Sequence, residues 1–197
     1  DLVGALALDT RDLAGALDSL RAALDTTDAN AHNSLGCVLR DTGDLDGALT
    51  HYSKAVELDP GLALAHSNLG GVLRRQGRFE EAVRSCTRAI ELAPEFAEAY
   101  NNLGTAYYGL EKLDAAILSH RHAIDLDPDN ADAHHLLGVV LLKADRPDEA
   151  LASCRKALSL ADNSPLTYIN LGDILRALGD LEGGIDAYRR ALPLEPD

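Results

Sequence analysis

Methionine and tryptophan are absent from the 197 residues of this chain, and aromatic residues make up only 4% of them. Because not even an initiator methionine is present, we expect the chain to be a fragment or a processed form with a truncated N-terminus. The shortage of large rings argues against a thick core, and the many Ala and Leu residues favour thin helices that pack through small side chains. The composition therefore predicts helices rather than a sheet.

Basic residues and long apolar stretches are also scarce. The chain has 18 Lys and Arg against 32 Asp and Glu, which gives a net charge of −14. Phosphate contacts need clustered cations, so we expect no nucleic-acid partner. No apolar stretch approaches the ~20 residues that span a membrane, and no basic surface helix is present, so we expect no membrane partner. The hydrophobic content of 46% nevertheless excludes a disordered chain.

Cysteine is rare as well. Cys37, Cys86 and Cys154 are odd in number, lie far apart and form no CxxC pair. These spacings fit neither a disulfide framework nor a zinc site, and we interpret Cys86 and Cys154 as buried small hydrophobic residues. The cysteine usage favours a reducing compartment, so we predict a cytoplasmic location.

The sequence does contain a repeat of 34 residues. Leu-Gly pairs end at this period, and a small residue lies twelve residues beyond each glycine. Self-similarity at such a period indicates a solenoid of stacked helical units. The repeat predicts a partial repeat 1–28, repeats 29–62, 63–96, 97–130 and 131–164, and a terminal repeat 165–197, all in one solenoid domain. The glycines are Gly36, Gly70, Gly104, Gly138 and Gly172, and the small residues are Ala48, Ala82, Ala116, Ala150 and Gly184.

Each repeat carries two stripes of apolar residues with helical spacing. In repeat 63–96 the first stripe includes Leu69 and Leu73, and the second includes Phe79 and Val83. Gly77 lies between the stripes, where the end of a helix favours a residue with positive φ. The pattern predicts a helical hairpin in every repeat, with helices of about 13–15 residues.

The glycine of each Leu-Gly pair lies inside the first helix of its repeat. Glycine there costs ~1 kcal/mol relative to alanine, so its recurrence suggests a packing reason. We expect the missing side chain to let the first helix approach the second at the Ala twelve residues further on.

The repeat resembles the tetratricopeptide repeat, whose signature is W-x2-L-G-x2-Y…A-x3-F…P. Departures from the signature are His or Tyr in place of the Trp, Cys86 and Cys154 in place of the late aromatic residue, and Asp162 in place of a closing Pro. The resemblance covers essentially the whole chain. It implies an all-α fold, an α-solenoid of tandem helix-turn-helix repeats in a right-handed superhelix, whose first helices line a concave groove. The residues of the first full repeat that match are His32, Leu35, Gly36, Leu39, Ala48, Tyr52 and Pro60.

No motif for catalysis, nucleotide binding or metal binding is found in the sequence. His120 and His122 are two residues apart on a predicted helix, so they point to different faces. We interpret the residues in the fourth place of each repeat as one recurrent packing position. We therefore predict no enzyme activity, no cofactor and no metal site. The fourth-place residues are His32, His66, Tyr100, His134 and Tyr168.

Asparagine recurs immediately before the Leu-Gly pairs, at Asn68, Asn102 and Asn170. One interpretation is a family consensus kept by duplication, or a bond that holds neighbouring repeats together. The other is a row of amides in the groove that offers donors and acceptors to a bound peptide backbone. The Asn-Leu-Gly triplets resemble those in the superhelical arms of O-linked N-acetylglucosamine transferases, where such a row holds extended substrates. Leu136 and Ser34 occupy the same place in the other two repeats.

The places expected to line the groove carry five basic and four acidic residues, a balance of +1 against −14 for the whole chain. An acidic or phosphorylated peptide would suit this groove, although a merely solvated face explains the same charges. Asn101 and His135 share the fifth place of their repeats and complete the candidate peptide groove. The lysines of a chaperone-tail clamp are missing, so we expect no adaptor of that kind. The basic residues are Arg40, Arg74, Arg75, Lys143 and Arg176, and the acidic ones are Asp41, Glu98, Asp132 and Asp173.

We therefore predict a non-catalytic scaffold for protein–protein interaction that binds an extended peptide segment of a protein ligand. Two alternatives stay open. One is the substrate-recruiting arm of a larger, glycosyltransferase-like enzyme, and the other is an array that self-associates end to end. The second rests on apolar residues near the two ends of the chain, which include Leu2, Val3 and Leu6, and Ile185, Tyr188 and Leu192.

Overall fold

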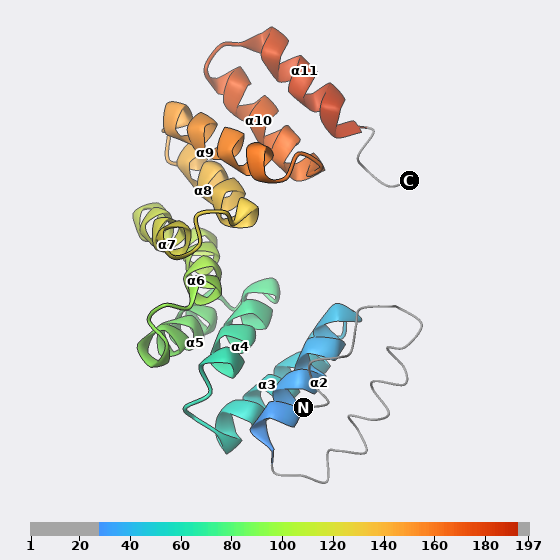
Figure 1. The fold of residues 1–197 in the computed structure, drawn as a ribbon, viewed down its shortest axis with the longest axis vertical. Helices are drawn as coiled ribbons and strands as arrows, with labels where there is room; N and C mark the ends of the chain where they lie inside the picture. The colour runs from blue at the N-terminus through green and yellow to red at the C-terminus, as the bar shows by residue number, and fades with distance from the viewer. Residues whose placement is uncertain (1–27, 193–197) are drawn as a thin grey trace. The chain divides into compact units, whose positions relative to one another are not determined.

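The computed structural model of the chain describes residues 28–192. The predicted partial repeat 1–28 lies outside these residues except for Asp28, and so does its apolar face with Leu2, Val3 and Leu6. Within 28–192 the chain forms ten α-helices, α2 to α11, and no strand. Figure 1 shows them as consecutive helical hairpins, so the all-α solenoid of helix-turn-helix repeats is confirmed.

The chain divides into two compact units, and each is described by itself. Unit 1 ends at Glu95, and unit 2 begins at Phe96. In unit 1, α2 pairs with α3 and α4 pairs with α5, while α4 also packs against α3 and α2 of the preceding hairpin. Tyr52 and Val72 are buried in its core, with Leu39 and Leu69 packed around them. The described helices of unit 1 are α2 (Ala29–Asp41), α3 (Leu45–Leu58), α4 (Ala63–Arg75) and α5 (Phe79–Leu92).

Unit 2 repeats this plan three times. Each second helix packs against the first helix of the next hairpin, α7 against α8 and α9 against α10. Ile117, Leu141, Cys154 and Ile174 are buried in its core. Its helices are α6 (Ala97–Gly109), α7 (Leu113–Leu126), α8 (Ala131–Lys143), α9 (Pro147–Leu160), α10 (Pro165–Ala177) and α11 (Leu181–Ala191).

The helices end where the sequence predicts. Gly43, Gly77 and Gly179 follow the first helices of their repeats with φ of +87°, +75° and +84°, which confirms their predicted turn role. The same turn in the other two repeats is made by Glu111 and Asp145, with φ of 58° and 57°. Those two positions were not predicted, because their side chains give no sign of a left-handed backbone.

Helix lengths agree with the prediction of about 13–15 residues except in α11, which is shorter. The helices α2 to α10 have 13 or 14 residues each, and α11 has 11. Within residues 28–192, no helix is both long enough and apolar enough to cross a membrane. Cys86 and Cys154 are fully buried, as predicted, and all three cysteines are free thiols.

The glycines of the Leu-Gly pairs make room mainly for a different residue than predicted. A Cβ atom on Gly36 would lie 2.6 Å from Cε1 of Tyr52, sixteen residues further on. On Gly70 it would first meet Sγ of Cys86, and the carbonyl oxygen of Ala82 only next, at 3.3 Å. The predicted approach at the Ala twelve residues on is present at Gly70 and Gly138, where the carbonyl oxygens of Ala82 and Ala150 would lie 3.3 and 3.4 Å from the Cβ. What the prediction missed is that at Gly36, Gly70, Gly104 and Gly172 the side chain four residues beyond that small residue lies closer still and needs the space.

Candidate functional site

The candidate groove residues all lie on first helices. Unit 1 contributes residues from α2 and α4, and unit 2 contributes residues from α6, α8 and α10. Their hydrogen bonds, ion pairs and burial differ from one residue to the next. The set consists of Arg40, Asn68, Arg74 and Arg75 in unit 1, and of Asn101, Asn102, His135, Lys143, Asn170 and Arg176 in unit 2.

Asn68 is bonded to the neighbouring repeat. Its side chain is 5% exposed, and Nδ2 donates a hydrogen bond to Oδ1 of Asn33 at 2.9 Å. The same nitrogen lies 3.7 Å from Sγ of Cys37, and Nη1 of Arg40 donates to Oδ1 of Asn68 at 3.5 Å. These contacts tie α4 to α2, as the structural interpretation of the asparagines expects.

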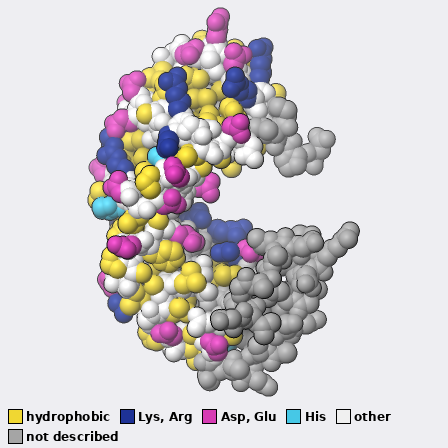
Figure 2. All heavy atoms as spheres, viewed as in Figure 1, with side chains coloured by type: hydrophobic (Ala, Val, Ile, Leu, Met, Phe, Trp, Pro, Cys, Tyr) yellow, Lys and Arg dark blue, Asp and Glu magenta, His cyan; other side chains and the backbone are white. Residues whose placement is uncertain are grey.

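The three arginines of unit 1 lie at the C-terminal ends of α2 and α4. Nε of Arg40 pairs with Oδ1 of Asp41 at 2.9 Å. Arg74 is half-buried, and its buried Nε has no hydrogen-bond partner within residues 28–192. Burial lowers the pKa of Arg74, with a smaller opposing effect from Cys86, and the charge of Arg75 lowers the pKa further. Figure 2 shows Lys and Arg side chains gathered on the surface over the end of α4.

Asn101 and His135 each bond to another helix of unit 2. Nδ1 of the buried His120 donates to Oδ1 of Asn101 at 2.7 Å, which joins α7 to α6. Nδ1 of His135 lies 3.2 Å from Oγ1 of Thr167, a contact between α8 and α10. Burial lowers the pKa of His135, with a smaller opposing effect from the charge of Asp132. Both side chains thus help to hold neighbouring helices in place.

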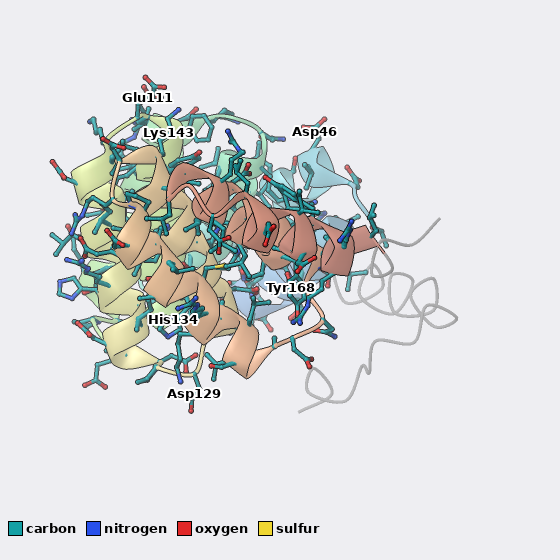
Figure 3. All side chains as sticks on the ribbon, turned by 90° about the horizontal axis from the view of Figure 1, so that it is seen from above. Asp46, Glu111, Asp129, His134, Lys143 and Tyr168 are labelled. Carbon is teal, nitrogen blue, oxygen red and sulfur yellow. The ribbon has the colours of Figure 1, made fainter. Side chains whose placement is uncertain are left out.

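The two candidate cations of unit 2, Lys143 and Arg176, have acidic partners. Nζ of Lys143 lies 3.6 Å from Oε1 of Glu111 and 5.9 Å from the ring centre of Tyr108. Figure 3 shows Glu111 and Lys143 near one another at one edge of the molecule. Nη2 of Arg176 lies 3.3 Å from Oδ1 of Asp173, and the Tyr188 hydroxyl donates to that same oxygen at 2.9 Å.

The asparagines of unit 2 are in other settings than Asn68. Asn102 is half-buried on α6. Asn170 is 7% exposed, and its Nδ2 has no hydrogen-bond partner among the described residues. That nitrogen lies 3.1 Å from the place that a Cβ on Gly138 would take, so it faces α8. The row of amides in a peptide groove stays a prediction, and its three members are not equivalent.

Asn33 and Thr167, which bond to the candidate residues Asn68 and His135, were not themselves chosen from the sequence. Asn33 and Asn68 are separated by 35 residues, and His135 and Thr167 by 32. Each of these pairs therefore joins positions about one repeat apart. Polar side chains spaced by the repeat length, give or take two residues, are the signal that would have found them.

Two histidines in the fourth place of their repeats bind the backbone. Nε2 of His66 donates to the carbonyl oxygen of Pro60 at 3.1 Å, and Nε2 of His134 donates to that of Pro128 at 3.0 Å. Each bond joins a first helix to the proline that closes the preceding repeat, which agrees with a packing position. Within residues 28–192, no three His, Cys, Asp or Glu side chains are placed to hold a metal ion.

The last hairpin carries an apolar face that no described residue covers. Leu166, Leu181, Ile185 and Leu192 are each at least half exposed. A hollow of about 300 Å³ lies between α10 and α11, lined by Ile169, Ile185, Tyr188, Arg189, Ala191 and Leu192. These include the residues from which the sequence predicts end-to-end association.

One protein family and several solved structures match the chain. The model of the family described as the C-terminal domain of cilia and flagella-associated protein 70 matches residues 2–197. None of the curated proteins compared with the sequence matches it.

The solved structures share the fold. MamA from Desulfovibrio magneticus RS-1 is 28% identical, with a TM-score of 0.67 over 77% of this chain and 87% of MamA. TTC0263, a thermophilic tetratricopeptide-repeat protein of Thermus thermophilus, is 24% identical, with a TM-score of 0.75 over 86% and 92% of the two chains. YrrB, described as a tetratricopeptide-repeat protein with an unusual peptide-binding site, is 22% identical, with a TM-score of 0.65 over 97% and 95%.

Proposed function

Because the chain belongs to the family of the cilia and flagella-associated protein 70 C-terminal domain, a tetratricopeptide-repeat domain, we propose that it is a non-catalytic scaffold that binds an extended peptide segment along its first helices. Domains of this class typically mediate protein–protein interactions and are typically non-catalytic. The peptide-binding site named for YrrB supports the same kind of ligand.

The observation that carries the proposal is a row of hydrogen-bonded side chains between α2 and α4 in unit 1. The buried Asn33 and Asn68 bond to each other, and Asn68 accepts a hydrogen bond from the half-buried Arg40. A side chain such as Arg40 that is held in place before binding loses less entropy when a peptide docks on it. The second helices carry no candidate residue of this set, so we expect the peptide on the first helices.

A pair of bulky substitutions tests this proposal. Peptides are first selected from a displayed library against the whole chain, and their affinity is measured by fluorescence anisotropy. Leu64→Trp adds a ring at an exposed place on α4 that is expected to face the groove. Thr87→Trp adds the same ring at an exposed place on α5. We expect only Leu64→Trp to weaken binding. Equal effects of the two variants, or selection of no peptide, would contradict the scaffold.

Self-association is a second candidate, and the exposed face of α11 favours it. Leu151 and Leu158 occupy the equivalent places on α9 and pack into the core of unit 2 beside α10. Ile185 and Leu192 have no such cover, being 50% and 69% exposed. The occupant that matches this face is a helix of a second copy, docked as α10 docks on α9. Light scattering over a concentration series tests this, since Ile185→Glu should then lower the average mass and Asp186→Ala should not.

The name of the matched family supports a location as well. It would place this scaffold in a cilium or flagellum, a finer location than the cytoplasm that cysteine usage predicts. Fluorescence microscopy of the tagged protein in ciliated cells of its source tests this, because a diffuse signal that excludes the axoneme would contradict it.

A further inference from the structure

Arg74 is a half-buried cation for which residues 28–192 supply no carboxylate. Its Nε is buried and makes no hydrogen bond to any of these residues, and none of them forms an ion pair with its guanidinium. Burying a charged donor without an acceptor is costly, and proteins usually pair or hydrate such a group. The lack of a partner is notable in a chain with a net charge of −14.

Two other arginines occupy the same place in their repeats and provide an internal comparison. Arg40 lies 34 residues before Arg74 and pairs with Asp41, the next residue. Arg176 lies 102 residues after Arg74 and pairs with Asp173, three residues earlier. In the repeat of Arg74 those two places hold Arg75 and Gly71. Of the three repeats with arginine at this place, only this one has no carboxylate at either of the two partner places.

The electrostatic surroundings of Arg74 agree with the missing partner. Burial lowers the pKa of Arg74, Cys86 opposes this with a smaller raising effect, and the like charge of Arg75 lowers the pKa further. Both residues lie in the last turn of α4, where the helix dipole favours cations. The dipole explains why arginine is tolerated there. It does not satisfy the buried Nε, which still lacks an acceptor.

We propose that Arg74, with Arg75 beside it, binds one anionic side chain of the peptide segment, a carboxylate or a phosphate group. This inference rests on the proposed scaffold function and adds the chemistry of its ligand. A guanidinium can donate two parallel hydrogen bonds to either group, and the exposed Arg75 adds attraction at longer range. Binding returns to Arg74 the counter-charge that Asp41 and Asp173 give to the equivalent arginines.

The first experiment uses small anions and the folded chain. Nitrogen–proton correlation spectra of the arginine Nε–H groups are recorded during titration with acetate and, separately, with inorganic phosphate. The Arg74 resonance is identified as the one that Arg74→Lys removes. We expect it to shift saturably with at least one of these anions, while the Arg176 resonance does not. Saturation by acetate identifies a carboxylate, and saturation by phosphate alone identifies a phosphorylated residue. Equal, unsaturable shifts of both resonances would overturn the proposal.

Two variants make the test independent of any single substitution. Arg75→Asp places a carboxylate next to Arg74, as Asp41 is next to Arg40, and should remove the saturable shift while circular dichroism stays helical. Arg176→Gln is the matched control, because it removes one positive charge at the same place of another repeat. A saturable shift that survives Arg75→Asp, or that is lost in Arg176→Gln, would also overturn the proposal.

Peptide binding separates this inference from the scaffold function itself. For a selected peptide that contains Asp or Glu, Arg74→Gln should weaken binding at least about tenfold, because charge-assisted hydrogen bonds are strong. Replacing the acidic residue of the peptide by its amide should have the same effect. If Leu64→Trp blocks the peptide but neither change weakens it, the scaffold stands and the anion site fails. If no peptide binds but the Arg74 resonance still saturates, the scaffold fails and the anion site stands.

Discussion

Units 1 and 2 are built on the same 34-residue plan, but they satisfy their polar side chains differently. In unit 1 the amide of Asn68 is bonded to Asn33, and Nε of Arg74 has no hydrogen-bond partner among residues 28–192. In unit 2 the cation Arg176 is paired with an acid, and it is the buried Nδ2 of Asn170 that no described residue binds. The place of a residue in the repeat sets its helix and its face. Its chemical role depends on what the neighbouring repeat provides.

The turns show a similar difference. The two turns between a first and a second helix in the described part of unit 1 use glycine, at Gly43 and Gly77. Two of the three equivalent turns of unit 2 force Glu111 and Asp145 into the left-handed region. Residues with a Cβ pay a conformational cost there that glycine avoids. Unit 2 therefore holds backbone strain at two turns where unit 1 has none.

The largest expected effect comes from the glycines opposite tyrosine, one in each unit. A Cβ on Gly36 would lie 2.6 Å from the ring of Tyr52, which is fully buried. A Cβ on Gly172 would lie 2.5 Å from the ring of Tyr188, which is half-buried and has room to move. We expect Gly36→Ala to lower the free energy of unfolding by about 2 kcal/mol, because overpacking outweighs the helix propensity of alanine.

Gly172→Ala is the matched control for that substitution, and we expect it to cost less than half as much. Denaturant unfolding and hydrogen exchange of amides in each unit measure both effects, since local stability need not be uniform along a repeat array. Equal losses in the free energy of unfolding would mean that the exposure of the tyrosine does not decide whether its ring can move aside for the added methyl group.

The asparagines should give the next largest effect. Asn68→Ala removes the bond to Asn33 and leaves the buried Oδ1 of Asn33 without that donor. We expect a loss of about 1–1.5 kcal/mol in the free energy of unfolding. Asn170→Ala removes an amide nitrogen that already lacks a partner, so its cost should be confined to lost packing. A larger loss for Asn170→Ala than for Asn68→Ala would refute this difference between the units.

The fold was largely predictable because its signals are local and repeated. The spacing of Leu69 and Leu73 indicates one helix, that of Phe79 and Val83 another, and Gly77 the turn between them. Glu111 and Asp145 escaped prediction because the helices on either side fix their backbone, and their own side chains do not. Tyr52 opposite Gly36 was missed for a related reason, since helix rotation decides which side chain crosses the glycine.

The candidate site was less predictable than the fold. The sequence identifies Asn68 and Asn170 as equivalent, yet the amide of Asn68 bonds to Asn33 of the preceding repeat, while Nδ2 of Asn170 faces Gly138 and bonds to no described residue. Arg74 was recognised only as one of five groove cations. What distinguishes Arg74 is visible only in the structure, where Asp41 and Asp173 pair with the equivalent arginines Arg40 and Arg176. Partner choice across repeats is a tertiary property that the pattern of one repeat does not contain.

A smaller effect is expected from exchanging turn residues between the units. Glu111→Gly should raise the free energy of unfolding by about 0.5–1 kcal/mol, because it relieves the left-handed backbone at the cost of extra unfolded-state entropy. Gly77→Glu should lower it by a similar amount, since a Cβ there meets nothing within 4 Å and only φ opposes it. Thermal unfolding of both variants checks the pair. Asp145→Gly should gain less, because aspartate tolerates this region better. Changes of the same sign in Glu111→Gly and Gly77→Glu would show that turn strain does not distinguish the units.

The smallest effect concerns two histidines with lowered pKa, one in each unit. Burial lowers the pKa of His51 in unit 1, and the charge of His32, whose Nδ1 lies 2.9 Å from that of His51, lowers it further. For His135 in unit 2, burial acts against the charge of Asp132. A lowered pKa means that the unfolded chain takes up a proton before the folded one does. Stability is therefore present above the usual histidine pKa of about 6.5 and is lost as the pH falls below it.

His32→Gln tests the part of this effect that belongs to unit 1. It removes the imidazole whose electrostatic effect lowers the pKa of His51, so the pKa of His51 should rise toward its usual value, while that of His135 stays unchanged. The loss of stability on acidification should shrink by a few tenths of a kcal/mol, because a shift of one pKa unit corresponds to about 1.4 kcal/mol. Titration of the imidazole resonances by nuclear magnetic resonance measures both pKa values in one sample. If His51 keeps its low pKa in the variant, burial alone sets it, and the stacked pair of His32 and His51 is a packing contact without electrostatic coupling.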